Sequence, residues 1–177
     1  MSRQIKNIIA ITVFLICISL INVAGQNIEI EIRGMNAFTF ILIIAVLLQV
    51  IFFIPSFLLK TEKYYDIVGS LTYIITISIA YFSVENKTMI DSIIYFYVMV
   101  WALRLGIYLF RRVRNDGKDV RFEKAKRHFF WFLQYWMGQA LWVSLTACAA
   151  IIAILSPEED TLPCLLYTSD AADDTPC

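Results

Sequence analysis

Polar residues recur at helical spacing inside the apolar part of this chain, and their types could do chemistry. Asp66, Ser70 and Tyr73 are separated by four and three residues, so they lie on one face of a helix. Arg104 lies in a second apolar stretch that runs into a strongly basic loop. A charge at membrane depth costs at least a few kcal/mol, so it is rarely without a function or a partner. This combination indicates a place where an anionic ligand enters from the water side.

Four of the expected helices bring polar side chains into the same half of the membrane. Counted at 1.5 Å per residue from the helix ends, Tyr73 and Arg104 both lie about 10 Å deep. Gln49 and Gln139 reach the same half from two further apolar stretches. Unpaired polar groups are costly in lipid, which favours a polar pocket under the basic loop, with both glutamines in its wall. The structural alternative is that Arg104 snorkels or pairs with Asp66, while the glutamines form interhelical hydrogen bonds.

The composition is that of a membrane protein. The 177 residues are 59% hydrophobic and 17% charged, against about 45–50% and about 25% in soluble domains. Five apolar stretches are long enough to cross a bilayer core of about 30 Å, and helices are expected because lipid cannot satisfy an open backbone. The stretches are 8–24, 37–59, 67–84, 92–110 and 129–155. The first is longer than the apolar core of a signal peptide, which favours a retained helix. The predicted fold is an all-α, polytopic membrane helix bundle over residues 1–155.

Lysine and arginine are concentrated on one side of the predicted helices. The N-terminal segment, the loop at 60–63 and the loop at 111–128 carry 12 of them, against only Arg33 and Lys87 on the opposite side. The positive-inside rule therefore predicts that the N-terminus and the basic loop 111–128 are cytosolic. Topology alone accounts for part of this charge.

The end of the chain has a different character. Residues 156–177 contain six acidic residues and no basic one, and we predict that they form no domain. Within them, CLLYTSDAAD at 164–173 resembles a translated sequencing adaptor. We therefore expect residues 164–177 to be artefactual, genuine sequence to end near Pro163, and the chain to be a fragment of a longer gene product.

Three sequence blocks resemble an uncharacterised multi-spanning membrane family related to steroid 5-alpha-reductases. YDIVGSLTY at 65–73 is similar to the family signature (F/Y)D-x-x-GS-x-TY. The run at 101–123, which begins WALRLG and ends RFE, resembles a second family block, and QALWV at 139–143 resembles a third. The likeness covers about residues 60–155 and is specific in order and spacing.

The resemblance implies an integral membrane oxidoreductase acting on CH–CH groups. In the better-known reductases, NADPH binds from the cytosolic side and gives hydride to a carbon–carbon double bond conjugated to a carbonyl of a lipid or sterol-like substrate. Motif matching assigns candidate catalytic residues (Tyr73, Asp66), cofactor-binding residues (Arg104, Arg111, Asp119, Arg121) and a pocket residue (Gln139). The guanidinium forks suit phosphates, and Tyr73 could donate a hydrogen bond as enolate charge develops.

Two departures from the family pattern limit this expectation. No glutamate lies within the second helix, where the classical reductases use one, and two later family motifs do not occur. The fragment alone is therefore expected to be inactive. The rival functions are an isoprenylcysteine- or lipid-methyltransferase-like enzyme that binds S-adenosylmethionine, and a non-catalytic lipid-binding or scaffold protein. The expected partners are membrane lipids and a hydrophobic small molecule, with no metal and no nucleic acid.

Overall fold

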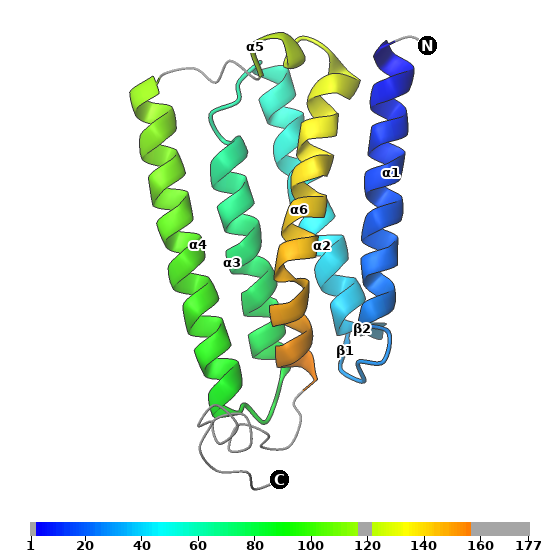
Figure 1. Ribbon diagram of the computed structural model, residues 1–177, viewed down its shortest axis with the longest axis vertical. Coiled ribbons are helices and arrows are strands. Elements are labelled where there is room, and N and C mark those ends of the chain that lie inside the picture. The colour runs from blue at the N-terminus through cyan, green and yellow to red at the C-terminus, as the bar shows by residue number, and fades with distance from the viewer. Residues whose placement is uncertain (1–2, 117–121, 157–177) are drawn as a thin grey trace, which may run out of the picture.

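The computed structural model describes residues 3–116 and 122–156 of the chain. Its elements are α1 (Arg3–Ala24), β1 (Glu31–Ile32), β2 (Met35–Asn36), α2 (Ala37–Leu58), α3 (Tyr65–Ser83), α4 (Met89–Asp116), α5 (Phe122–Ala125) and α6 (Phe129–Leu155). Figure 1 shows the five long helices side by side, with α4 at one edge of the bundle and α1 at the other. The predicted all-α, polytopic membrane helix bundle is confirmed, because five of the described helices are long and apolar enough to cross a membrane.

The predicted helix boundaries needed correction at the basic end of the bundle. We give this name to the end where α2 and α4 finish and α1, α3 and α6 begin (Figure 1). The first helix starts at Arg3 rather than at residue 8. The expected loop 111–128 is partly helical, since α4 continues to Asp116 and α5 follows at Phe122–Ala125. Once a helix leaves the apolar core, water can satisfy its side chains, so a change in hydropathy does not mark where its backbone hydrogen bonding stops.

The opposite end of the bundle is closed by a short hairpin and two side-chain caps. β1 and β2 pair antiparallel, with Glu31 opposite Asn36. The Asn36 side chain accepts a hydrogen bond from the Thr39 backbone at 3.1 Å and so caps α2. At the start of α4, Asp91 accepts from the Thr88 backbone at 2.8 Å, and the Thr88 hydroxyl accepts from the Asp91 backbone at 3.2 Å. This reciprocal pair is a capping box that satisfies two orphan donors.

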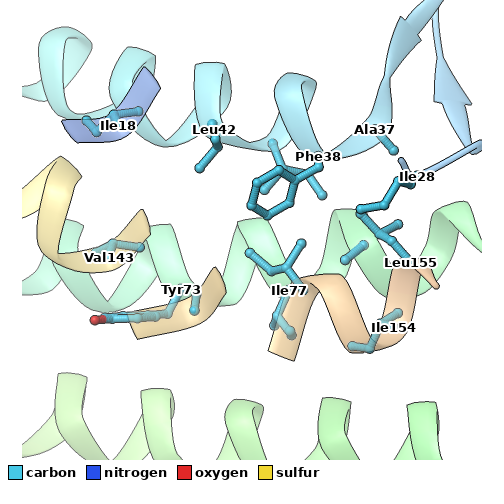
Figure 2. Packing of buried hydrophobic residues seen from close by; sticks show 14 of the residues in the cluster. Ile18, Ile28, Ala37, Phe38, Leu42, Tyr73, Ile77, Val143, Ile154 and Leu155 are labelled. Atoms are coloured by element: carbon cyan, nitrogen blue, oxygen red, sulfur yellow. The ribbon is translucent and has the colours of Figure 1, made fainter. Parts of the chain in front are cut away.

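Two hydrophobic clusters fill the interior. The larger lies in the half of the bundle nearer the hairpin, and Figure 2 shows Phe38 of α2 facing Ile77 of α3 beside Leu155 of α6. Tyr73 lies at the edge of this cluster with its hydroxyl pointing away from Ile77 (Figure 2). The second cluster lies towards the basic end and is largely aromatic. Its members include Phe53, Phe122, Phe132 and Trp136. The candidate site is a cleft beside these two clusters, and polar side chains line part of it.

Candidate functional site

A cleft of about 640 Å³ runs along α3 between α4 and α6. Its polar lining includes Asp66, Ser70 and Tyr73 from α3 and Gln134 and Gln139 from α6. The apolar and aromatic lining includes Trp101, Leu105, Leu109, Trp142 and Val143. The structure therefore brings three of the predicted site residues, Asp66, Tyr73 and Gln139, into one cavity. The predicted helical face on α3 supplies three of these polar groups, Asp66, Ser70 and Tyr73.

An ion pair stands at the mouth of the cleft. The Arg112 guanidinium donates to the Asp66 carboxylate at 2.9 Å, which ties α4 to the first turn of α3. The side chains are 39% and 12% exposed, respectively, so the pair is in contact with water. Arg112, and not Arg104, is thus the partner of Asp66. This removes the structural alternative in which Asp66 neutralises the deep arginine.

The deep end of the cleft is formed around Tyr73, which is 4% exposed. Its hydroxyl shares a hydrogen bond with the hydroxyl of Thr146, which also donates to the Trp142 carbonyl at 2.7 Å. The Trp101 ring packs edge-on against the Tyr73 ring, with 4.9 Å between the two ring centroids. The phenol is therefore held from α6 and α4 while it borders the cavity. A hydroxyl placed in this way can exchange its Thr146 partner for a ligand oxygen.

Gln139 is held against the backbone of α3. Its amide nitrogen donates to the Tyr65 carbonyl at 3.2 Å, and its amide oxygen is buried without a partner among the described residues. The close approach depends on Gly69, because a Cβ at that position would lie 2.2 Å from the Gln139 amide nitrogen. Gly69 and Gln139 belong to different motif blocks. Their contact explains why one block has a glycine where the other places a glutamine against it.

Gln49 does not line the cleft. It is fully buried on α2 and donates to the Thr72 hydroxyl at 3.0 Å, on a different face of α3 from Tyr73. Its predicted place in the pocket wall was wrong, because Thr72, one residue before Tyr73, turns towards α2. Depth in the membrane alone does not show which face of a neighbouring helix a side chain meets.

Arg104 lies outside the cleft, in an adjacent groove of about 320 Å³. Trp101 and Leu105 line both cavities, so they form the wall between them. Arg104 and Arg111 are exposed and make no ion pair or hydrogen bond within the described part of the chain. We call the exposed row that contains them the donor row of α4. It consists of Tyr97, Trp101, Arg104, Tyr108 and Arg111. The other two predicted cofactor residues, Asp119 and Arg121, lie outside the described residues.

Sequence reasoning missed the way in which α5 docks on the basic end. Phe122 is 1% exposed and packs against Tyr65, Phe132 and Tyr135. Beside it, Lys126 pairs with Glu62 at 2.8 Å, with 20% and 8% of the side chains exposed. These contacts hold the start of α3 against α5, including Tyr65, the residue immediately before Asp66. The sequence signal for this docking was Phe122, a single aromatic residue in a segment rich in lysine and arginine, where the charge pattern drew attention instead.

Thr146 was also missed, although the sequence carried a signal for it. It follows Gln139 by seven residues, so the two share a face of α6. Its hydroxyl is the group that holds Tyr73.

Among the described residues, no cluster of three or more His, Cys, Asp or Glu residues could hold a metal ion.

These features define a class: a polytopic membrane protein with a polar cleft at the basic end of its helix bundle. Residues 52–171, more than half of the chain, match the family described as "Protein of unknown function (DUF1295)". The chain belongs to this family. The match begins in α2 and includes every residue that lines the cleft except Phe14. Searches of the curated proteins and of the solved structures found no match.

Proposed function

We propose that this protein belongs to a membrane-embedded NADPH-dependent reductase system that saturates a carbon–carbon double bond conjugated to a carbonyl in a lipid or sterol-like substrate. The observation that carries the proposal is the buried Tyr73 hydroxyl at the deep end of the cleft. Support also comes from the motif blocks that resemble relatives of the steroid 5-alpha-reductases. Both the catalytic and the cofactor roles that follow are parts of this proposal.

The cleft suits a hydrophobic small molecule. Its volume of about 640 Å³ lies within the range of roughly 300–1,000 Å³ that is usual for small-molecule pockets. Trp101 and Trp142 are 47% and 64% exposed, so the deep end borders the lipid side of the bundle as well as the cleft. A substrate that dissolves in the bilayer can therefore reach Tyr73 without crossing a polar barrier.

In the proposed reaction, Tyr73 stabilises the charge that develops on the substrate carbonyl oxygen. A preorganised donor in a water-poor site contributes on the order of 10²–10³ in rate when it is aimed at such an oxygen. The single Thr146 hydroxyl proton goes to the Trp142 carbonyl, so Tyr73 is the donor of the hydrogen bond that the two hydroxyls share. Once Tyr73 donates to the substrate, the Thr146 proton can turn from the Trp142 carbonyl to the phenol oxygen. Thr146 would then keep the phenol in place through both states.

The donor row of α4 fits the phosphates of the cofactor. Arg104 and Arg111 are seven residues apart on one face, which separates them by about 10 Å along the helix. Guanidinium groups bind phosphate oxygens with two parallel hydrogen bonds, and the neighbouring Trp101 and Tyr108 rings offer stacking faces. When bound, NADPH supplies the hydride. Trp101, which borders both cavities, separates the groove from the cleft and would set how closely the two ligands approach.

Asp66 takes a positioning role in this proposal. Its carboxylate is occupied by Arg112 and holds α4 against α3 at the mouth of the cleft. It is about 10 Å from Tyr73 along the helix, too far for both to act on one carbonyl. The basic end, with Arg111, Arg112 and Lys126, would face the cytosol, where NADPH is available.

The test is a thermal-shift measurement on the purified full-length protein with NADPH, NADH and S-adenosylmethionine in parallel. We expect NADPH to stabilise the protein, and Arg111→Gln to weaken that stabilisation. Arg33→Gln is the matched control, because Arg33 is an exposed arginine at the opposite end of the bundle. The same samples are then assayed for NADPH oxidation with a panel of hydrophobic conjugated enones, beginning with a steroid 4-en-3-one. Tyr73→Phe should lower kcat about a hundredfold or more.

Each other outcome points to a different function. Stabilisation by S-adenosylmethionine alone would replace the reductase with a methyltransferase-like enzyme. A response to none of the three cofactors, together with no oxidation of NADPH, would favour a lipid-binding or scaffold protein.

A further inference from the structure

We infer that the cleft is a one-sided aqueous inlet, which brings the proton consumed by the reaction from the basic end to Tyr73. This inference rests on the proposed function for the use of the proton. The inlet itself is a property of the described structure and can be tested without any substrate.

The inlet has a continuous polar wall. Asp66, Ser70 and Tyr73 follow one another along α3 at the spacing of one helical face, and all three line the cleft. The Ser70 hydroxyl lies 3.4 Å from the Asp66 carbonyl oxygen, and Gln134 faces the same cavity from α6. Polar groups therefore occur at each level between the mouth and the Tyr73 hydroxyl.

The mouth of the inlet is wet and the cavity is large enough for water. The Arg112 and Asp66 side chains at the mouth are 39% and 12% exposed. With about 30 Å³ per water molecule in the liquid, a cavity of about 640 Å³ has room for a substrate and several waters. Charged and polar walls hold water, whereas apolar cavities stay dry.

Beyond Tyr73 the face of α3 that lines the cleft becomes apolar. The next inward residues of α3 are Ile77 and Ala80, both fully buried. They pack in the larger hydrophobic cluster with Ala147 and Ile151 of α6. The hydroxyls that α3 carries beyond Tyr73 are occupied elsewhere: Thr76 donates to the Thr72 carbonyl, Ser78 pairs with Tyr95 and Tyr81 pairs with Ser92. None of these side chains lines the cleft, so they do not continue its polar wall. A proton can therefore reach Tyr73 from the basic end and not from the hairpin end.

The chemistry of the proposed reaction needs such a supply. Hydride adds to the β-carbon, the electron pair of the double bond moves onto the carbonyl oxygen, and Tyr73 gives that oxygen its proton. The resulting enol becomes the saturated ketone by moving the proton from oxygen to carbon. Each turnover thus consumes one hydride and one proton, and the Tyr73 phenolate must take a new proton from water in the cleft. Ser70 is the positioning residue that keeps this water between Asp66 and Tyr73.

The inlet is tested by cysteine labelling in a chain whose four native cysteines are replaced. Leu105→Cys reports on the cleft, and Leu103→Cys is its matched control, since Leu103 lies two residues away on the same helix but faces outwards, 48% exposed. Arg127→Cys marks the basic end. The probe is a small, membrane-impermeant methanethiosulfonate applied to right-side-out and inverted membrane vesicles.

We expect Leu105→Cys to react from the same side as Arg127→Cys, at least ten times faster than Leu103→Cys. Equal labelling at the two leucine positions, or labelling of Leu105→Cys from the opposite side, would overturn the one-sided inlet. This result does not depend on whether the protein is a reductase.

The proton route is tested by kinetics of Ser70→Ala with the enone and NADPH. We expect kcat to fall about tenfold, within the range of general acid–base effects after partial bypass by water, while the KM for NADPH stays unchanged. The solvent deuterium isotope effect on kcat should rise, and added imidazole should restore much of the rate. Thr76→Val removes a hydroxyl from α3 that does not line the cleft and should leave all three quantities unchanged.

The two possible failures are distinguishable. A full-length wild-type protein that oxidises no NADPH with any enone overturns the reductase and the proton route together. An active wild type with a normal Ser70→Ala variant, or a slow variant that imidazole does not rescue, overturns the proton route alone.

Discussion

Two exposed rows of α4 lie at the same depth on the same helix, yet their chemistry is opposite. The donor row contains two arginines and three aromatic residues with hydrogen-bonding groups. The second row, which we call the apolar row, contains only hydrocarbon side chains, 47–63% exposed: Phe96, Val100, Leu103, Ile107 and Phe110. Exposure alone therefore does not distinguish a surface that meets lipid from one that meets a polar partner. The distinction lies in the cost of placing each row against acyl chains.

That cost falls almost entirely on Arg104. A guanidinium at the centre of a membrane helix is unfavourable by at least a few kcal/mol. Because Cβ atoms tilt towards the helix N-terminus, the Arg104 side chain starts out directed away from the basic end, which makes snorkelling to that end less direct. A phosphate-bearing ligand on the donor row would offset the cost. The apolar row needs no such partner, and lipid suffices.

The strongest way to break this comparison is to place a charge on the apolar row. Leu103→Arg should make membrane insertion less favourable, or lower the free energy of unfolding, by about 3 kcal/mol, because the new charge meets only lipid. Arg104→Leu should be neutral or stabilising in the absence of ligand, since it removes the same cost. Thermal unfolding in detergent and the membrane-inserted fraction on expression measure both effects. Equal tolerance of arginine at positions 103 and 104 would contradict the assignment of the rows.

A second prediction sharpens the role of the donor row. Arg104→Gln should weaken NADPH binding about 10- to 100-fold, the loss expected for one hydrogen-bonded charge at about 1.5–3 kcal/mol. Arg104→Lys keeps the charge but loses the planar fork, so its loss should be intermediate. The dissociation constant is measured by fluorescence titration, with Leu103→Gln as the control on the apolar row. An Arg104→Gln variant that binds NADPH normally would remove this residue from the cofactor site.

The third face of α4, which packs on α3, should respond to volume instead of charge. Gly106 lies against Ser70, and a Cβ there would meet the Ser70 Cβ at 3.1 Å. Gly106→Ala should therefore destabilise the protein by about 1 kcal/mol, at the low end of the effects of overpacking. Gly34→Ala is a contrasting control, since it has open space but a positive φ of 75° and loses stability through backbone strain alone. Denaturant or thermal titration of both variants separates crowding from strain.

The sequence predicted the membrane architecture because hydropathy is a local property. Each apolar stretch could be read without its neighbours, and the boundaries were wrong mainly at the basic end, where α4 continues to Asp116. The face of α3 that carries Asp66 and Tyr73 was also predictable, since helical spacing is local. Helix pairing was not local. Gln49 meets Thr72 and Asp66 meets Arg112 because of how α2, α3 and α4 rotate against one another. Close approaches at small residues accompany this packing, as where Gly106 of α4 lies against Ser70 of α3.

The smallest expected effect concerns the ion pair that joins α3 to the donor-row helix. Asp66→Asn removes the partner of Arg112, whose side chain is 39% exposed, so water takes over much of the interaction. The expected loss of stability is about 1 kcal/mol or less, and it should shrink in high salt. Glu62→Gln is the informative comparison, because Glu62 and Lys126 are more buried, at 8% and 20%. Its loss should be larger and less sensitive to salt, since the stranded Lys126 ammonium is less hydrated. Unfolding temperatures at low and high salt measure both. If Asp66→Asn proved as costly and as salt-resistant as Glu62→Gln, the mouth of the cleft would be dry, and the aqueous inlet along α3 would lose its entrance.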